Sequence, residues 1–197
     1  AACRARLPGV RVEIAAAEAL PFPGGAFDRT LSQLVVNFLA NAPAGVHEMA
    51  RVTRPGGTVA AAVWDYAGEM TLLRALWDAA VALDPAAAAQ DEGRSMPYCT
   101  PAELEALWSA AGLEDVAVSP VAVSAGYDCF DDLWRSLEAG VGPSGAYVAA
   151  LGPAERAALA AELRGRLGAG DAPFTLTARA WIAVGSAPAA ARRAPAP

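Results

Sequence analysis

Asp65 and Tyr66 are the polar side chains of this 197-residue chain that are best placed to face a substrate. They directly follow an apolar run, Thr58–Trp64, whose continuity is typical of a strand buried on both faces of a parallel sheet. In such folds ligands bind beyond the carboxyl ends of the strands. The alternative is structural, and the sequence favours it: Asp65 caps the next turn and Tyr66 packs in the core.

Two further ionisable residues are candidates for a functional role. His47 is the single histidine, and it lies on the polar side of a helix predicted over residues 43–53, so we expect a solvated imidazole. Arg179 alternates with apolar residues along the last predicted strand, residues 175–184. That alternation places it on the exposed face of the strand, with a clamp for a substrate carboxylate as the alternative.

Composition and charge exclude several classes of protein. The net charge of -6 argues against a nucleic-acid-binding surface, which needs a basic face. No apolar stretch is long and pure enough to span a bilayer, and no secretory signal is recognisable. The three cysteines are odd in number and widely spaced, which predicts neither a disulfide framework nor a metal site, but thiols in a reducing cytoplasm. They are Cys3, Cys99 and Cys129.

The predicted elements alternate between strands and helices. Pro55, Gly56 and Gly57 form a predicted turn between the helix at 43–53 and the buried strand. Thr100 and Glu103 form a capping box that begins a further helix at Pro101. The remaining predicted strands are 10–14, 27–36, 114–119 and 175–184, and the remaining predicted helices are 1–7, 69–83, 130–140 and 153–167, with 142–151 less regular. This order predicts an α/β doubly wound fold.

Two segments carry a resemblance to a known family. They are Ala17-Glu18-Ala19-Leu20-Pro21-Phe22-Pro23-Gly24-Gly25-Ala26-Phe27-Asp28 and Arg51-Val52-Thr53-Arg54-Pro55-Gly56-Gly57. In this order and at this separation they resemble class I S-adenosylmethionine-dependent methyltransferases, of the type 11 group related to quinone biosynthesis. The resemblance implies a Rossmann-like, mostly parallel sheet with an antiparallel last strand, and S-adenosyl-L-methionine as the cofactor.

The resemblance also implies cofactor-binding positions. The loop after the family's third strand carries an Asp-Ala pair that binds adenine, and the matching residues here are Ala16 and Ala17. Ala16 lacks the carboxylate acceptor, for which the neighbouring Glu18 is a candidate substitute, although a solvated Glu18 is the simpler expectation. Gln33 matches a position whose backbone and side chain line the cofactor pocket.

Two family features are absent from the N-terminal part of the sequence. We find neither the Gly-rich turn after a first strand nor the acidic residue after a second. We therefore expect an N-terminally truncated domain that lacks the first two strands, in which the segment 10–14 pairs elsewhere or lies loosely. The predicted domain covers 1–185 with a helical insert at approximately 128–170, and 186–197 is predicted to be a disordered Ala/Pro/Arg tail.

The implied activity is in-line methyl transfer to a small apolar or aromatic acceptor in the cytoplasm. No catalytic residue is predicted, because the cofactor carries the reactivity. We expect the truncated chain alone to be inactive. A non-catalytic methyltransferase-like scaffold and a dehydrogenase on the same fold stay as alternatives. The predicted acceptor pocket, whose apolar members could equally pack the insert onto the sheet, comprises Asp65, Tyr66, Met96, Tyr98, Phe130 and Trp134.

Overall fold

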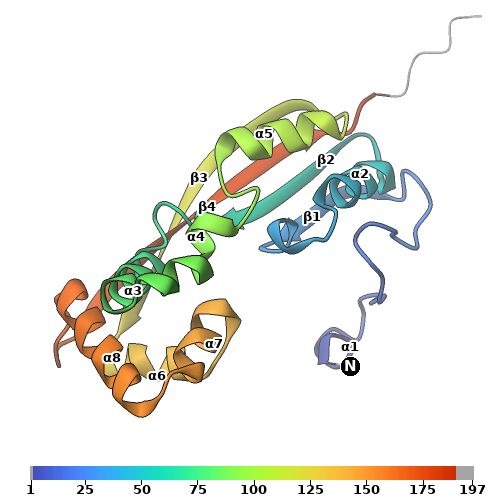
Figure 1. Cartoon of the computed structure of the whole chain (residues 1–197). Helices are drawn as coiled ribbons and strands as arrows, with labels where there is room; N and C mark the ends of the chain where they lie inside the picture. The colour runs from blue at the N-terminus through green and yellow to red at the C-terminus, as the bar shows by residue number, and fades with distance from the viewer. Residues whose placement is uncertain (1, 190–197) are drawn as a thin grey trace, which may run out of the picture. The chain divides into compact units, whose positions relative to one another are not determined.

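A four-stranded sheet organises the chain, and its strand order is β1-β2-β4-β3 (Figure 1). The computed structural model describes residues 2–189. The strands are β1 (Phe27–Gln33), β2 (Thr53–Trp64), β3 (Glu114–Tyr127) and β4 (Phe174–Ser186). β1 pairs with β2 in parallel, with Thr30 opposite Val59. This is the parallel pair expected between the segments that begin at Phe27 and Thr58.

β4 runs antiparallel to β2. Near one end of the pair the Ala187 N–H donates to the Gly57 carbonyl at 2.8 Å, and near the other the Asp65 N–H donates to the Arg179 carbonyl at 3.0 Å. Partner numbers thus fall along β4 as they rise along β2, which defines antiparallel pairing. The prediction of a Rossmann-like α/β sheet with an antiparallel last strand is confirmed.

The helices occupy the segments between the strands. α5 begins with the predicted capping box: the Glu103 N–H donates to Thr100 Oγ1 at 3.4 Å, and the Thr100 N–H donates to Glu103 Oε2 at 3.2 Å. The helices are α1 (Ala2–Arg6), η1 (Val36–Phe38), α2 (Ala42–Val52), α3 (Thr71–Leu83), η2 (Pro85–Gln90), α4 (Glu92–Ser95), α5 (Pro101–Ala110), α6 (Phe130–Glu138), α7 (Gly142–Ala150) and α8 (Pro153–Leu167).

Contacts divide the described residues into two units. The first comprises residues 2–62, 104–118 and 183–189. Its core is formed by the apolar faces of α2 and α5 and by β2. Trp108 on α5 is fully buried, and its indole N–H donates to the Val59 carbonyl of β2 at 3.4 Å, which satisfies the one polar atom of that side chain. The other buried residues include Val46, Met49, Val52, Ala61, Leu104 and Leu107.

The second unit comprises residues 63–103 and 119–182. Its core is helical: α3 packs against α8, α6 packs against α7, and the four helices share one cluster of buried apolar residues. Each of these helices contributes apolar residues at helical spacing. The fully buried members include Leu76, Trp77, Leu133, Val148, Leu159 and Leu163.

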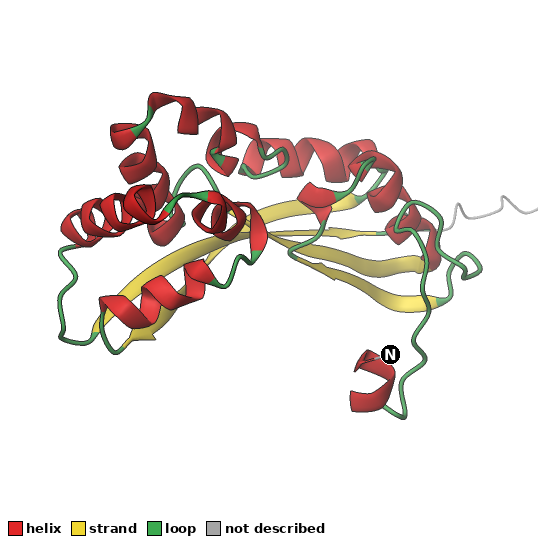
Figure 2. Ribbon diagram, turned by 60° about the horizontal axis from the view of Figure 1, so that its bottom comes forward, coloured by secondary structure: helices red, strands yellow, loops and turns green. Residues whose placement is uncertain are grey.

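The predicted strand at Val10–Ile14 is wrong. These residues form a long loop between α1 and β1 (Figure 2), and Ile14 is 90% exposed. A strand is stabilised by hydrogen bonds to a neighbouring strand. Among residues 2–189, no strand pairs with this segment, so the alternation of its apolar residues has no sheet to face. The segment lies loosely, which is one of the two predicted alternatives.

The predicted Pro-Gly-Gly turn lies inside a strand. β2 begins at Thr53, directly after α2, and its register against β1 jumps from Phe27–Thr53 to Arg29–Thr58. The extra residues on β2 form a bulge, which needs special backbone conformations. Gly56 has φ +70°, and a Cβ on the buried Gly57 would lie 2.6 Å from the Asp28 carbonyl oxygen. The glycines therefore shape the strand rather than separate it from the helix.

Two other predicted boundaries also differ. β3 continues to Tyr127, beyond the predicted end at Ser119, because Pro120 is tolerated in a strand at the edge of a sheet. β4 includes Ser186, the first residue of the predicted tail. Most of that tail, from residue 190, lies outside the described residues.

Candidate functional site

In the first unit, α2 holds the loop that the family resemblance assigns to cofactor binding. The Arg51 guanidinium donates to the carbonyls of Leu20 at 3.1 Å and Phe22 at 2.9 Å, and to the Glu48 carboxylate at 2.5 Å. Glu48 in turn accepts a hydrogen bond from the Leu20 N–H at 2.8 Å. The hydrogen bond from Arg51 is the largest cause that lowers the pKa of Glu48 to about 2. The loop backbone is therefore held both at its Leu20 N–H donor and at its Leu20 and Phe22 carbonyl acceptors.

The predicted cofactor residues lie on this loop and at the end of β1. Ala16 is exposed and Ala17 is half-buried. Glu18 Oε1 accepts from the Asn41 N–H at 3.3 Å, so this side chain ties the loop to the start of α2 rather than being fully solvated. Gln33 is the last residue of β1 and is exposed, and no described residue hydrogen-bonds its side-chain amide. Gln33 is therefore free to meet a ligand.

The chain leaves β1 through a strained turn. Leu34 has φ +59°, a left-handed conformation that is unfavourable for a leucine, and its N–H donates to the Ala62 carbonyl of β2 at 2.8 Å. The following turn, η1, buries Asn37 to 4% exposure. Neither amide atom of Asn37 has a hydrogen-bond partner within residues 2–189. Sequence reasoning missed Asn37, although it is the single polar residue in the stretch 34–39.

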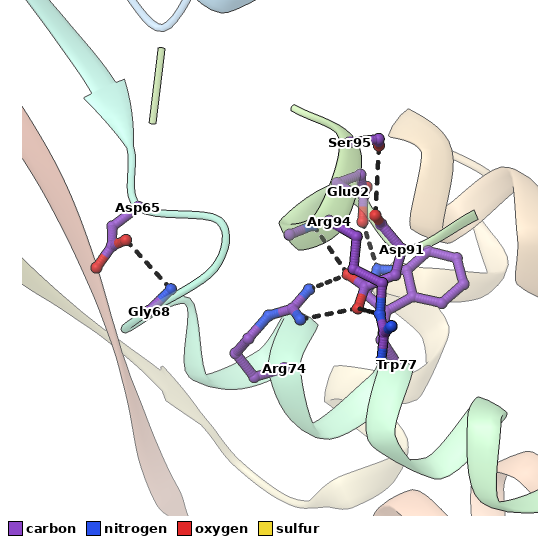
Figure 3. A network of polar contacts seen from close by, with 9 residues as sticks. Asp65, Gly68, Arg74, Trp77, Asp91, Glu92, Arg94 and Ser95 are labelled. Carbon is purple, nitrogen blue, oxygen red and sulfur yellow. Dashed lines mark hydrogen bonds and ion pairs between the residues drawn. The ribbon is translucent and has the colours of Figure 1, made fainter. Parts of the chain in front are cut away.

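In the second unit, Asp65 serves as a structural acceptor at the end of β2. Its carboxylate accepts from the N–H groups of Gly68 at 3.1 Å and Glu69 at 3.0 Å, and from Arg179 Nε at 2.9 Å and Nη2 at 2.6 Å (Figure 3 shows the bond to Gly68). Burial alone would raise the pKa of Asp65, but the hydrogen bonds from Glu69 and Arg179 outweigh it and lower that pKa. These contacts support the structural interpretation of Asp65.

The alternation of residues along the last strand predicted that Arg179 lies on its exposed face. The structure instead shows a side chain engaged with its neighbours. Its guanidinium donates to Asp65 and, through Nη1, to Glu69 at 2.6 Å, and it lies 4.6 Å from the centre of the Trp181 ring. Only 25% of its side chain is exposed. The positive charge of Arg179, which a substrate carboxylate would need, is thus already paired with two carboxylates of the chain.

Tyr66 and Cys99 belong to the same buried region. Tyr66 is 7% exposed and Cys99 is 3% exposed. Burial raises the pKa of the Cys99 thiol to about 12, which keeps it protonated and unreactive. Of the other two cysteines, Cys3 is exposed and Cys129 is half-buried.

The other four predicted pocket residues lie in two separate segments. Met96 and Tyr98 are half-buried in the connection between α4 and α5. Phe130 and Trp134 lie on α6 with stacked rings whose centres are 6.0 Å apart, and Phe130 is 2% exposed within the helical core. For Phe130, the structure therefore supports the alternative that it packs the insert.

An apolar pocket of about 230 Å³ lies elsewhere in the second unit, and the six predicted residues do not line it. The start of α3 and residues of β3 and β4 form it. The sequence signals were present, because Leu176 and Ala178 alternate along the last strand and Met70 and Leu73 share a helical face, but both patterns also describe ordinary core. Its lining includes Met70, Leu73, Val123, Tyr127, Leu176 and Ala178.

A buried polar network joins α3 to α4 in the same unit (Figure 3). Arg74 Nη1 donates to Asp91 Oδ2 at 3.0 Å, Arg94 Nε lies 3.4 Å from the same oxygen, and the Trp77 indole N–H donates to Glu92. Burial would raise the pKa of Asp91, but the hydrogen bonds from Arg74 and the Gly93 N–H lower it overall. Asp91 is thus paired with two arginines of the chain, and Glu92 accepts from Trp77, so the network is structural.

Within residues 2–189, no three His, Cys, Asp or Glu side chains are grouped so that they could hold a metal ion. In the same residues, no helix combines the length and the apolar character that crossing a membrane requires.

The strand order and the antiparallel last strand define a Rossmann-like α/β protein. The YcgJ protein of Bacillus subtilis has a similar fold, with a TM-score of 0.51 and 16% sequence identity, over 96% of this chain and 77% of that chain. A putative methyltransferase from Bacillus halodurans aligns with a TM-score of 0.49 and 12% identity, over 88% of this chain and 76% of that chain.

Sequence comparison then points to one family. Residues 1–61 match the family model described as a methyltransferase domain. The malonyl-[acyl-carrier protein] O-methyltransferase of Erwinia pyrifoliae is 35% identical over 95 residues, which are 48% of this chain and 31% of that protein. The match thus spans about a third of the length of this curated relative. The predicted resemblance to class I S-adenosylmethionine-dependent methyltransferases is confirmed.

Proposed function

We propose that this chain is part of an enzyme that transfers a methyl group from S-adenosyl-L-methionine to a small molecule. The observation that carries the proposal is the position of the family match. Residues 1–61 include the loop held by Arg51 and the end of β1 with Gln33, which are the segments that the resemblance assigns to the cofactor. The match therefore falls on the predicted site and not only on the helices that support it.

The described residues fit a cofactor at this edge of the sheet. Gln33 offers an unpaired amide at the carboxyl end of a parallel strand, where ligands bind in this fold. The loop at Ala16 and Ala17 offers backbone groups, and Glu18 and Arg51 hold that loop in place. The cofactor supplies a sulfonium methyl group that is already activated. The residues of this chain then need only bind, orient and exclude water.

The acceptor class that we propose is small and apolar or aromatic. The support is the apolar pocket of about 230 Å³, whose walls include Leu73, Val123 and Leu176. In the methyl transfer, the walls of this pocket would hold the acceptor and exclude water, while the cofactor would supply the activated methyl group. Asp65 and Arg179 hold the turn that follows β2 and take no part in this step.

A non-catalytic scaffold is the second candidate. Ala16 favours it, because alanine cannot supply the carboxylate acceptor that the family has at this position. Cytoplasmic localisation and the lack of a nucleic-acid partner stay predictions, supported by the net charge of -6 and the absence of a disulfide framework.

Calorimetric titration with S-adenosylhomocysteine separates the two candidates. We expect saturable binding to the natural full-length protein. Tritiated methyl transfer is then measured with phenols and quinones, and with malonyl-[acyl-carrier protein], the acceptor in the name of the curated relative. Absence of binding would refute the methyltransferase proposal and favour the scaffold, and transfer to any of these acceptors would refute the scaffold.

A further inference from the structure

Asn37 is the one buried side-chain amide in the described chain whose two polar atoms both lack a partner. It is 4% exposed, so water does not reach it freely. Burying an amide without hydrogen bonds is unfavourable, and native proteins rarely keep such a group without a use for it. A leucine of similar size would fill the same space without that cost.

The backbone places Asn37 inside the protein by a strained path. The stretch 34–39 is otherwise apolar, and the left-handed Leu34 turns the chain from β1 into η1. The hydrogen bond from Leu34 to Ala62 of β2 holds this conformation, at 2.8 Å. Strained backbone of this kind concentrates at functional sites. Strain and an unpaired amide therefore occur within four residues of each other.

Along the chain, Asn37 lies between residues that belong to the proposed cofactor site or hold it. Gln33 precedes it by four residues at the carboxyl end of β1, and Asn41 follows it by four residues and donates its N–H to Glu18 at 3.3 Å. A Cβ on Gly45 would lie 2.5 Å from Leu39 and 3.9 Å from Ala17, so the segment after η1 and the loop at Ala17 pack on the same part of α2.

We infer that Asn37 is a binding residue that recognises the adenine base of the cofactor, an inference that rests on the proposed function. A side-chain amide presents a carbonyl acceptor beside an NH2 donor in one plane. Its complement is a planar edge that carries a donor beside an acceptor, as the amine and ring nitrogen of adenine do. The amide stays unpaired in the free protein because its partner is the ligand.

The test uses two matched variants, Asn37→Leu and Asn41→Leu. Asn41 is the same residue type four positions later, but its Oδ1 accepts from the Ala44 N–H at 3.1 Å and caps α2. Without ligand, Asn37→Leu is expected to raise the urea midpoint of unfolding, and Asn41→Leu to lower it. Calorimetry is expected to show that Asn37→Leu weakens binding of S-adenosylhomocysteine at least about tenfold.

A second ligand tests directly whether Asn37 recognises the adenine base. S-inosylhomocysteine replaces the adenine amine by an oxygen, so the natural protein should bind it about tenfold more weakly, and Asn37→Leu should lose this preference. Equal binding of the two ligands by the natural protein overturns the inference, as does unchanged affinity in Asn37→Leu. A lowered midpoint in Asn37→Leu also overturns it, because the amide then has a partner, such as buried water, in the free protein. If the natural protein binds neither ligand, the proposed function itself fails.

Discussion

At the scale of single residues, two arginine–carboxylate pairs of this chain hold loops. Arg51 and Glu48 fix the loop at Leu20, and Arg179 and Asp65 fix the turn at Gly68. Each carboxylate accepts both backbone N–H groups and guanidinium donors, which satisfies its lone pairs in a partly buried place. The site of a methyltransferase needs such positioning more than it needs an acid or a base.

Asp65→Asn separates a structural role from a catalytic one. The amide that replaces the carboxylate cannot accept all four hydrogen bonds, and it leaves Arg179 with Glu69 as its remaining carboxylate. We expect the free energy of unfolding to fall by about 3 kcal/mol, as for a broken buried pair. Urea unfolding measures this loss, with Glu69→Gln as the control, because the Glu69 side chain is 61% exposed and should matter much less. A variant as stable as the natural chain but without methyl transfer would instead make Asp65 a substrate-facing group.

At the scale of elements, sequence patterns predicted the structure correctly where one physical rule determines it. The continuous apolar run ending at Trp64 predicted a buried parallel strand, and Thr100 with Glu103 predicted the start of α5. The pattern at Val10–Ile14 failed because alternation alone does not provide a neighbouring strand to pair with. The glycines at 56 and 57 were assigned to a turn because a bulge and a turn need the same backbone freedom.

The candidate site was predictable only in part. Ala16, Ala17, Glu18 and Gln33 came from a motif, and the structure adds why their loop is fixed. Asn37 could not be recognised as important, because a polar residue in an apolar stretch has meaning only once its burial and lack of partners are known. The apolar pocket proposed for the acceptor was missed because Leu176 and other members follow patterns that also describe packed core.

The bulge in β2 makes a prediction about Gly57. A Cβ at this position would lie 2.6 Å from both the Asp28 carbonyl oxygen and Thr53 Cγ2. Backbone cannot move away as a flexible side chain can, so Gly57→Ala should lower the free energy of unfolding by about 2 kcal/mol. Gly165→Ala is the matched control, since a Cβ there meets nothing within 4 Å and alanine favours the helix α8 by about 1 kcal/mol. Urea unfolding of both variants checks the opposite signs, and a Gly57→Ala chain of unchanged stability would show that the bulge can relax.

At the scale of the whole molecule, acidic groups with lowered pKa values occur in both contact-defined units. Glu48 belongs to the first unit, and Asp65 and Asp91 belong to the second. Each accepts hydrogen bonds from an arginine of its own unit, so the folded state favours the charged form of the carboxyl. The protein as a whole should therefore be sensitive to acid.

The sign of this dependence follows from proton linkage. A carboxyl whose pKa is lower in the folded state stabilises the fold at a pH above its unfolded value, and this stabilisation is lost as the pH falls through the folded pKa. For Glu48 the loss runs from about pH 4.5 to about pH 2, and for Asp65 and Asp91 it begins near 3.8. Urea midpoints between pH 6 and pH 2 should fall over this window. Glu48→Gln should flatten the fall, whereas Glu138→Gln, on the exposed side of α6, should leave it unchanged. An unchanged slope in Glu48→Gln would mean that Arg51 holds the loop without its carboxylate partner.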